Sequence, residues 1–433
     1  MSLTQYHRIG SRVDTQALAN LLLNSLHAAE LAIPDLQQLG DRDLPLEWET
    51  PLGRVRVAGR GPDHHTGEFL LLIDLGGDDI YREVGRALQP NQISTVIDLA
   101  GDDTVLWEQT PGPGAGVMGI GLWIDLSGDD RYAGRNLSMG AGVFGAGLLW
   151  DAEGDDVYEG GSRVQGAGQY GVGVLLDGGG DDTYTAQLNS QGYGGTGGFG
   201  LLVDLAGNDS YSCTPLVPDD IEERIQRHDA PHYTNFCQGS AFGRRPAVSG
   251  GIGLLLDRKG NDRYAVDLFG QGSALWFGLG MLVDGAGHDR YQAFEHGQGD
   301  GVHLGAGLLS DWGGDDEYTG YEHCQGVGVD RAAGLLYDDS GDDLYRSHSE
   351  SQGAGVKPYG VGLLIDALGD DRYQAANTSQ GYSARPPDGF PESEWPVGVL
   401  LDLGGADGFV QPEIPQPDPR GRKQNRQGIA VDQ

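Results

Sequence analysis

The sequence predicts an all-β protein, a parallel β-helix or β-solenoid of about twelve coils with a short N-terminal capping helix. The phrase Asp-x-x-Gly-Asp-Asp-x-Tyr recurs twelve times, usually every 26 or 27 residues. The chain also contains 75 glycines, whose regular placement in the repeat indicates turns rather than disorder. A fixed period of roughly 20 to 50 residues is typical of stacked repeats, in which each unit buries its apolar face against its neighbours.

Residues 1–69 are expected to form a helix and a capping region. Asp14 is a suitable N-cap, apolar residues recur at helical spacing, and Pro34 is expected to stop the helix, which predicts a helix over 15–33. The first coil of a solenoid exposes an edge that would recruit other edges, so we expect this helix to cover that coil. The segment 46–59, LEWETPLGRVRVAG, alternates like a strand and leads into the first coil.

Residues 70–410 are the predicted solenoid domain, in which each repeat supplies the strands and turns of one coil. The segment GVGVLLD, at 171–177, fits a short strand whose side chains alternate between core and solvent. The GGGDD that follows fits a turn that requires the backbone freedom of glycine. A second strand follows Tyr184, and then a recurring Gln-Gly begins a glycine-rich return. Two or three short strands with tight corners therefore make one coil.

Two insertions interrupt the repeat, and a tail follows it. The larger insertion, 212–247, has a helix-like charge density, and long insertions in repeat proteins often carry function. Cys213 and Cys237 flank the irregular segment, where a disulfide and two free thiols are equally compatible with the sequence. The smaller insertion is 384–396, and the tail 411–433, which is Pro-rich and then basic, is expected to be disordered.

The formal net charge of −36 restricts the possible partners. A phosphate backbone requires a basic surface, so nucleic acid is excluded, and binding to anionic membranes is disfavoured. No stretch approaches the roughly 18 apolar residues of a membrane span, which excludes membrane insertion, and no N-terminal signal sequence is visible. We expect cations and a glycan or cell-surface component as partners. An extracytoplasmic location is favoured because millimolar calcium outside cells suits weak, repetitive sites.

The acidic positions of the motif are the main candidate site. Once coils stack, equivalent carboxylates form columns about 4.8 Å apart and repel one another by roughly 1 kcal/mol per neighbour in water. Calcium between coils, hydrogen bonds from turn amides, or protonation would relieve this repulsion, and calcium and amide capping stand as equal alternatives. The candidate calcium ligands are Asp74, Asp79, Asp125, Asp130, Asp151, Asp156, Asp177, Asp182, Asp204, Asp209, Asp257, Asp262, Asp284, Asp289, Asp311, Asp316, Asp338, Asp343, Asp366 and Asp371.

The motif resembles a known calcium-binding repeat. The segments LAGNDSY (205–211) and LGGDDIY (75–81) are similar to the glycine-aspartate nonapeptides of RTX proteins, which form calcium-filled parallel β-rolls. By this resemblance, Asp209 and Asp79 match the ligand aspartate of those repeats. RTX motifs recur every nine residues, whereas this chain has one motif per coil. The full-length pattern also resembles a group of uncharacterised bacterial β-solenoid proteins with GDDxY repeats, which implies the fold and no particular activity.

The aromatic position of the motif is Tyr in ten of the twelve repeats, with Val105 and Phe409 in the other two. Stacked coils would place these rings above one another. A ladder of rings buries apolar area and orders the turn, so we interpret the tyrosines as structural.

A second candidate site lies four residues after each Gln-Gly. There Trp276, His303, Asp330 and Lys357 occupy one repeat position, and the apolar residues beside them indicate that this column points outward. The arrangement resembles the sugar-binding, acid–base surfaces of β-helical polysaccharide lyases and hydrolases. That resemblance implies Trp276 as a substrate platform and His303, Asp330 and Lys357 as catalytic groups. A solvated polar face is the alternative.

A third candidate lies just before the Gln-Gly, where one repeat position holds His296, His323 and Glu350. Glu295 and Glu322 stand beside them. Two imidazoles one coil apart could share a zinc or copper ion, and ordinary surface histidines are the alternative.

These observations favour a non-enzymatic, calcium-stabilised structural or binding solenoid. A carbohydrate-active enzyme that uses the Trp276 to Lys357 column is the alternative function, with the 212–247 insertion as a possible gate. A metal-free cytoplasmic scaffold is the third.

Overall fold

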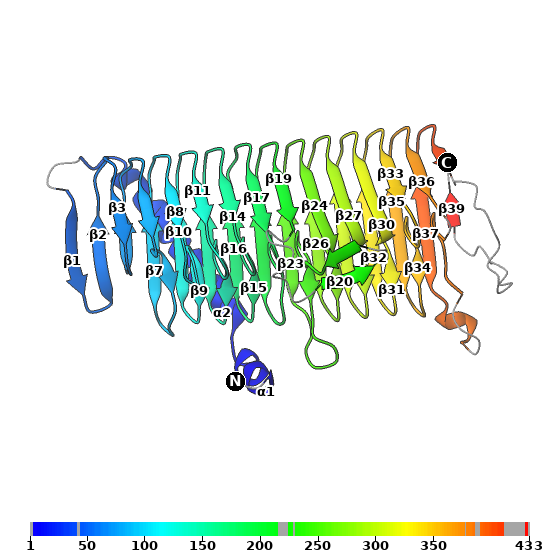
Figure 1. Cartoon of the computed structure of the whole chain (residues 1–433), viewed down its shortest axis with the longest axis horizontal. Coiled ribbons are helices and arrows are strands. Elements are labelled where there is room, and N and C mark those ends of the chain that lie inside the picture. The colour runs from blue at the N-terminus through cyan, green and yellow to red at the C-terminus, as the bar shows by residue number, and fades with distance from the viewer. Residues whose placement is uncertain are drawn as a thin grey trace. The chain divides into compact units, whose positions relative to one another are not determined.

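The computed structural model describes residues 3–40, 44–214, 224–227, 230–376, 378–385, 390–410 and 429–431. Its contacts divide the chain into two compact units. The first unit is Met1–Tyr211 with Gly251–Gly253, and the second is Ser212–Gly250 with Leu254–Gln433. Short parallel strands build both units (Figure 1). The predicted fold class is confirmed, because the chain is nearly all-β and forms a parallel β-solenoid of about 11 turns.

Three sheets build the first unit. The strands of its first sheet are β1 (Leu46–Thr50), β2 (Gly53–Val57), β4 (Leu71–Ile73), β7 (Ile93–Ile97), β10 (Ile120–Ile124), β13 (Ala146–Trp150), β16 (Val172–Leu176) and β18 (Phe199–Val203). The second sheet has β3 (His64–Thr66), β5 (Ile80–Arg82), β8 (Thr104–Leu106), β11 (Arg131–Ala133), β14 (Val157–Glu159), β17 (Thr183–Ala186) and β19 (Ser210–Cys213). The third has β6 (Arg86–Ala87), β9 (Ala115–Val117), β12 (Gly142–Val143) and β15 (Gly168–Gln169).

The second unit repeats this plan. Its first-sheet strands are β23 (Ile252–Leu256), β26 (Leu279–Val283), β29 (Ala306–Asp311), β32 (Ala333–Asp338), β35 (Val361–Asp366), β37 (Val397–Asp402) and β39 (Ile429–Val431). The second sheet has β24 (Arg263–Leu268), β27 (Arg290–Gly297), β30 (Glu317–Cys324), β33 (Leu344–Ser347), β36 (Arg372–Ala375) and β38 (Gly408–Val410). The third has β22 (Ala241–Phe242), β25 (Ala274–Leu275), β28 (Gly301–Val302), β31 (Gly328–Val329) and β34 (Gly355–Val356).

Neighbouring strands pair in a register that places the same repeat position on the same level. Tyr291 of β27 pairs with Tyr318 of β30, for example. The motif glycine makes the tight turn possible: Gly101 has φ of 141°, and a Cβ there would lie 1.6 Å from the carbonyl oxygen of Gly77. The Gln of the Gln-Gly pair links adjacent coils through hydrogen bonds. The side-chain amide of Gln325, for example, donates to the backbone carbonyl of Tyr318 in its own coil and to that of Arg346 in the next coil.

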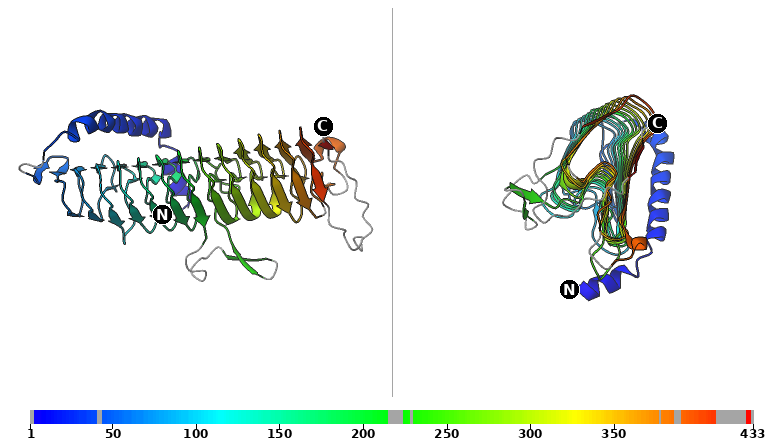
Figure 2. Two further views of the ribbon diagram at one scale, coloured as in Figure 1. Left: turned by 90° about the horizontal axis from the view of Figure 1, so that it is seen from above. Right: turned by 90° about the vertical axis from the view of Figure 1, so that its right-hand side faces the viewer.

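The N-terminal region contains two helices, α1 (Leu3–Gly10) and α2 (Thr15–Leu36). The predicted helix is confirmed, with Asp14 as its N-cap, but it continues three residues beyond the expected end and includes Pro34. The prediction that it covers the first coil is wrong: α2 lies along the first sheet of its unit (Figure 2). That sheet presents an apolar outer face, so Leu22 packs with Leu122 and Leu148 of two neighbouring strands.

An antiparallel hairpin, and not the helix, forms the edge of the first sheet. β1 pairs antiparallel with β2, and β2 pairs parallel with β4. The single strand expected over 46–59 is therefore two strands that meet at a turn between Thr50 and Gly53. The outermost strand is short and mostly exposed, which is a common way to limit edge-to-edge pairing.

The larger insertion contains an antiparallel strand pair where its charge density suggested a helix. β20 (Arg224–Arg227) pairs with β21 (Ala230–Tyr233), while 215–223 and 228–229 lie outside the described residues. Cys213 and Cys237 form a disulfide, which decides between the two alternatives left open by the sequence.

Parts of the smaller insertion and of the tail lie outside the described residues, namely 386–389, 411–428 and 432–433. A short 3-10 helix, η1 (Glu392–Glu394), lies in the insertion. Of the tail, Ile429–Val431 form β39, which pairs parallel with β37 and so is part of a sheet. Among the described residues, no helix combines the length and the apolarity that a membrane crossing would need.

Candidate metal centres

Two columns of carboxylates run through the turns between the first and second sheets of each unit. The opening Asp of each motif forms the first column, and the second Asp of the acidic pair forms the second column. All the predicted calcium ligands lie in these columns, and each exposes 2% or less of its surface. Asp98 and Asp103 belong to the same columns and are equally buried. The residue before each second-column Asp forms an outer column, which is exposed at Asp315 and Asp342.

In several coils the first-column carboxylate accepts two kinds of hydrogen bond. In one representative coil, Asp311 Oδ1 accepts the N–H of Gly313 in its own turn at 3.0 Å, and Oδ2 accepts the hydroxyl of Tyr291 from the preceding coil at 2.7 Å. Asp338 has the same two partners, the N–H of Ser340 and the hydroxyl of Tyr318. Amide capping is therefore present in these coils of the first column, whereas Oδ1 of Asp125, Asp151 and Asp366 is buried without a hydrogen-bond partner among the described residues.

The second column is capped at only one of its two oxygens. Asp316 Oδ1 accepts the N–H of Asp289, and Asp343 Oδ1 accepts that of Asp316, at 2.6 and 2.7 Å. The other oxygen, Oδ2, is buried and has no hydrogen-bond partner among the described residues at Asp103, Asp289, Asp316 or Asp343. A buried polar atom in this state is costly unless another group compensates it.

The outer column differs in both burial and direction. The Asp315 carboxylate accepts the N–H of Asp342, and the Asp342 carboxylate accepts that of Asp370, each at 3.0 Å. These side chains are exposed, so solvent has access to their remaining oxygens. The outer column therefore needs no further ligand.

The two buried columns lie close enough to act together. Carboxylate oxygens of Asp103, Asp125 and Asp130 all lie within 4.8 Å of one another. Burial and the carboxylates around it raise the pKa of Asp289 to about 9 and that of Asp316 to about 10. Each coil therefore requires either a retained proton or a cation near the second column. The donors are oxygens alone, which suits a hard cation such as calcium.

The aromatic ladder packs beside the columns as predicted. The rings of Tyr291 and Tyr318 stack with centroids 4.8 Å apart and an interplanar angle of 3°. Sequence reasoning missed His65, which stacks on Tyr81 and places Nε2 2.6 Å from Asp74 Oδ2, where a tyrosine hydroxyl would otherwise lie. No sequence signal identified it, because His65 precedes the first motif. Where Val105 replaces a ring, the buried Trp123 fills the ladder from the first sheet.

The second candidate site lies at tight turns between the third and first sheets. Trp276, His303, Asp330 and Lys357 have φ of 53°, 45°, 57° and 62°, so they occupy left-handed turn positions rather than strand positions. His303 Nδ1 lies 2.8 Å from Asp330 Oδ2. The sequence missed Arg245, from the larger insertion, whose guanidinium lies 5.6 Å from the centre of the Trp276 ring and whose Nη1 lies 3.5 Å from His303 Nε2. Lys357 is exposed at the equivalent turn one coil further on.

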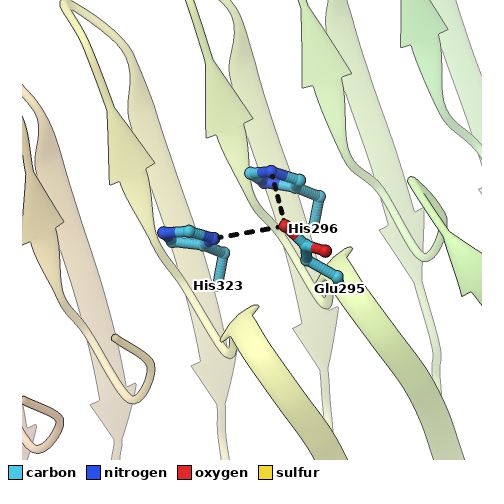
Figure 3. A group of neighbouring side chains, drawn as sticks. All are labelled: Glu295, His296 and His323. Carbon is cyan, nitrogen blue, oxygen red and sulfur yellow. Dashed lines mark ion pairs between the residues drawn. The ribbon is translucent and has the colours of Figure 1, made fainter. Parts of the chain in front are cut away.

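The third candidate site brings together Glu295 and His296 from β27 with His323 from β30 (Figure 3). Glu295 Oε1 lies 3.5 Å from His296 Nε2 and 3.8 Å from His323 Nδ1. Burial lowers the pKa of His323, but the adjoining carboxylates of Glu295, Glu350 and Asp300 outweigh it and raise the pKa to about 10. Without a metal, His323 is therefore an imidazolium among carboxylates.

Comparison with protein-family models, curated proteins and solved structures finds no match to this chain.

Proposed function

We propose that this protein is a non-enzymatic structural or binding module, a β-solenoid that calcium stabilises through its buried acidic columns. The observation that carries the proposal is the second-column Oδ2, which is buried and lacks a hydrogen-bond partner at Asp103, Asp289, Asp316 and Asp343. The same kind of atom recurs at one turn of successive coils. A recurring site calls for a ligand that can also recur, once per coil.

The charge of the columns supports a divalent cation. No Lys, Arg or His of the described residues forms an ion pair with Asp289, Asp316 or Asp343, so no protein cation neutralises these coils. Calcium accepts six to eight oxygen ligands at about 2.3–2.6 Å and tolerates irregular geometry. First- and second-column carboxylates of adjacent coils would supply some of these oxygens. Calcium must displace the retained protons, so its affinity should rise with pH.

The location and partner follow from weaker observations. Calcium is millimolar outside cells, which suits repeated sites of low affinity. The Cys213–Cys237 disulfide also fits an oxidising compartment. An extracytoplasmic module of this kind would bind a glycan or another cell-surface component. The exposed Phe277 and the adjoining Trp276 offer aromatic surface for sugar rings.

A calcium-dependent melt tests the main proposal. Protein stripped with EDTA should melt at a lower temperature than untreated protein, and added Ca²⁺ should restore the melting temperature by mass action. Asp316→Asn removes one second-column ligand and should reduce the calcium-induced shift. Asp315→Asn, the exposed neighbour in the outer column, should leave that shift unchanged. A melting temperature that does not respond to EDTA and Ca²⁺ would leave the metal-free scaffold as the better account.

An enzyme acting on polysaccharide is the second candidate function. The observation that favours it is the pairing of His303 with Asp330 at 2.8 Å beside Trp276, because a carboxylate can orient an imidazole for acid–base work. Soluble polysaccharides of several classes would be incubated with the wild-type protein, and new reducing ends or unsaturated products measured. Activity that His303→Ala and Lys357→Ala both abolish would support this function. Activity that survives both substitutions would remove this site from consideration.

A further inference from the structure

A band of cationic and aromatic side chains runs along the turns between the third and first sheets of the second unit. We call it the cationic band, and it consists of three cations and three rings: Arg245, Trp276, Phe277, Arg331, Lys357 and Tyr359. Arg245 comes from the larger insertion, and the others lie in the turns that follow β25, β31 and β34. All of them except Trp276 are exposed, so the band is a surface that a ligand can reach.

The charge of the cationic band is opposite to that of the chain. The chain has 64 acidic residues and only 28 Lys and Arg, with a net charge of −36. Among the residues that the structure describes, neither Arg245 nor Lys357 forms an ion pair with a carboxylate. Glu350 lies near Lys357, but His323 already pairs with it at 2.8 Å. Two of the three cations are therefore available to an anion that comes from outside.

The carboxylate of Asp330 positions the cations of the band. Its Oδ1 accepts Nη1–H of Arg331 at 3.0 Å, and its Oδ2 lies 2.8 Å from Nδ1 of His303. The other ring nitrogen of His303, Nε2, lies 3.5 Å from Nη1 of Arg245. The side chain of Asp330 exposes 25% of its surface and that of Arg331 exposes 51%, so the guanidinium is presented to solvent more than the carboxylate is.

Each guanidinium of the band lies beside an aromatic ring. The Arg245 guanidinium carbon lies 5.6 Å from the centre of the Trp276 ring, and that of Arg331 lies 5.4 Å from the centre of the Tyr359 ring. Phe277 and Tyr359 expose 54% and 42% of their surface. Aromatic rings offer an apolar face to the C–H groups of a sugar, and a guanidinium offers paired N–H donors to a carboxylate. The combination suits a sugar that carries a carboxylate.

Backbone hydrogen bonds hold successive turns of the band in register. The N–H of Trp276 donates to the carbonyl of Val302 one coil further on, and the N–H of Asp330 donates to that of Val356. The turns therefore recur at the coil spacing of about 4.8 Å. A linear polysaccharide lying along the band would meet a new turn about once per sugar residue. A surface fixed in this way loses little conformational entropy when it binds.

We propose that the cationic band binds a carboxylated polysaccharide, a chain of uronic-acid residues, through Arg245, Arg331 and Lys357. Arginine matches a carboxylate with two parallel N–H donors, and a neutral glycan has no group that uses this match fully. This assignment names the class of glycan for the binding module proposed above and rests on that proposed function. No residue of the band belongs to the acidic columns, so the assignment and the role of calcium can fail separately.

Calorimetric titration of the full chain with short oligogalacturonates tests the cationic band. Calcium-loaded protein would be exchanged into buffer without free Ca²⁺, and the fully methyl-esterified oligomer would supply the same sugar without its charge. We expect the acidic oligomer to bind, and its ester to bind at least about 10-fold more weakly. The double variant Arg331→Gln/Lys357→Gln should weaken binding of the acidic oligomer about 10-fold or more. Trp276→Leu should weaken it about fivefold, because a ring face is lost.

The matched control removes two cations away from the band. Arg263 and Arg372 are exposed arginines of β24 and β36 in the second sheet. Arg263→Gln/Arg372→Gln changes the net charge by the same amount and should bind the acidic oligomer like the wild type. Circular dichroism establishes that each variant is folded.

Four results would overturn the assignment. These are no binding of the acidic oligomer, equal binding of the acidic oligomer and its ester, equal losses in the two double variants, and tighter binding of dextran sulfate of comparable charge. If a neutral oligosaccharide binds and the acidic one does not, the binding module stands and only the uronic-acid assignment fails. If no saccharide binds, glycan binding fails as a whole, and the calcium-dependent melt still tests the role of calcium.

Discussion

At the scale of single residues, each motif tyrosine has two roles, and the sequence predicts only one of them. Its ring stacks on the rings of adjacent coils, which the repeat predicts. Its hydroxyl also donates to a first-column carboxylate of the next coil, as Tyr318 does to Asp338 Oδ2 at 2.6 Å. That hydrogen bond joins residues 20 positions apart. The motif shows that the tyrosine and the aspartate both recur, but it does not show that they pair across coils. The tyrosine is therefore part of the charge arrangement as well as of the core.

Tyr318→Phe separates these two roles. The ring and its stacking remain, while buried Asp338 loses a hydrogen bond, so we expect a loss of about 1–3 kcal/mol in the free energy of unfolding. Tyr337→Phe, beside Asp338 in the next coil, is the matched control, because Tyr337 also donates to a carboxylate, that of exposed Asp339. Its effect should stay within about 0.5 kcal/mol. Chemical denaturation measures both, and equal losses would contradict a role for the buried hydroxyl.

At the scale of elements, the strands and turns could be predicted because the same strand and turn patterns occur in every repeat. The residues of helix α2 could be predicted from the sequence, but the surface on which it packs could not. Its apolar stripe shows that one face is buried, and this stripe would look the same whether the helix covered the end of the first coil or the outer face of a sheet. Arg245 reaches Trp276 from the larger insertion, where no period applies. His65 and Trp123 complete the ring ladder from positions outside the motif, which is why the motif could not reveal them.

The packing of α2 on the first sheet gives a prediction at this scale. Leu22 exposes 2% of its surface and Leu23 exposes 61%, although they are neighbours on one helix. Leu22→Ala should cost about 2–5 kcal/mol of stability, as for other buried leucines. Leu23→Ala should change it by less than about 0.5 kcal/mol, because helix propensity is almost the same. Denaturant melts measure the stability. Limited proteolysis would reveal undocking of α2, and equal resistance of the two variants would argue against this packing.

At the scale of the whole molecule, the acidic columns should determine how stability depends on pH. Burial and neighbouring carboxylates raise the pKa of Asp316 to about 10 and that of Asp343 to about 11, from the usual 3.8. The folded protein thus holds these protons more tightly than the unfolded chain. Stability is then fully present below pH 3.8 and is lost as the pH rises toward the folded values, by up to about 1.4 kcal/mol per pH unit for each such group. This pH dependence is the opposite of ordinary acid denaturation, in which carboxylates that form ion pairs in the folded state lose stability as the pH falls.

We therefore expect metal-free protein to melt at progressively lower temperature between about pH 5 and pH 9, and calcium to raise the melting temperature most at the alkaline end, where fewer protons compete. The net charge of −36 also disfavours the folded state through surface repulsion. Added NaCl screens this surface repulsion but acts much less on buried groups, so the pH dependence should persist in high salt.

Asp316→Asn removes one titrating buried group and should flatten the dependence of melting temperature on pH, whereas Asp315→Asn in the exposed outer column should not. If the melting temperature of the metal-free protein rises with pH, the buried carboxyl groups of the columns are not stabilised by bound protons. If calcium raises the melting temperature most at pH 5, calcium does not compete with those protons.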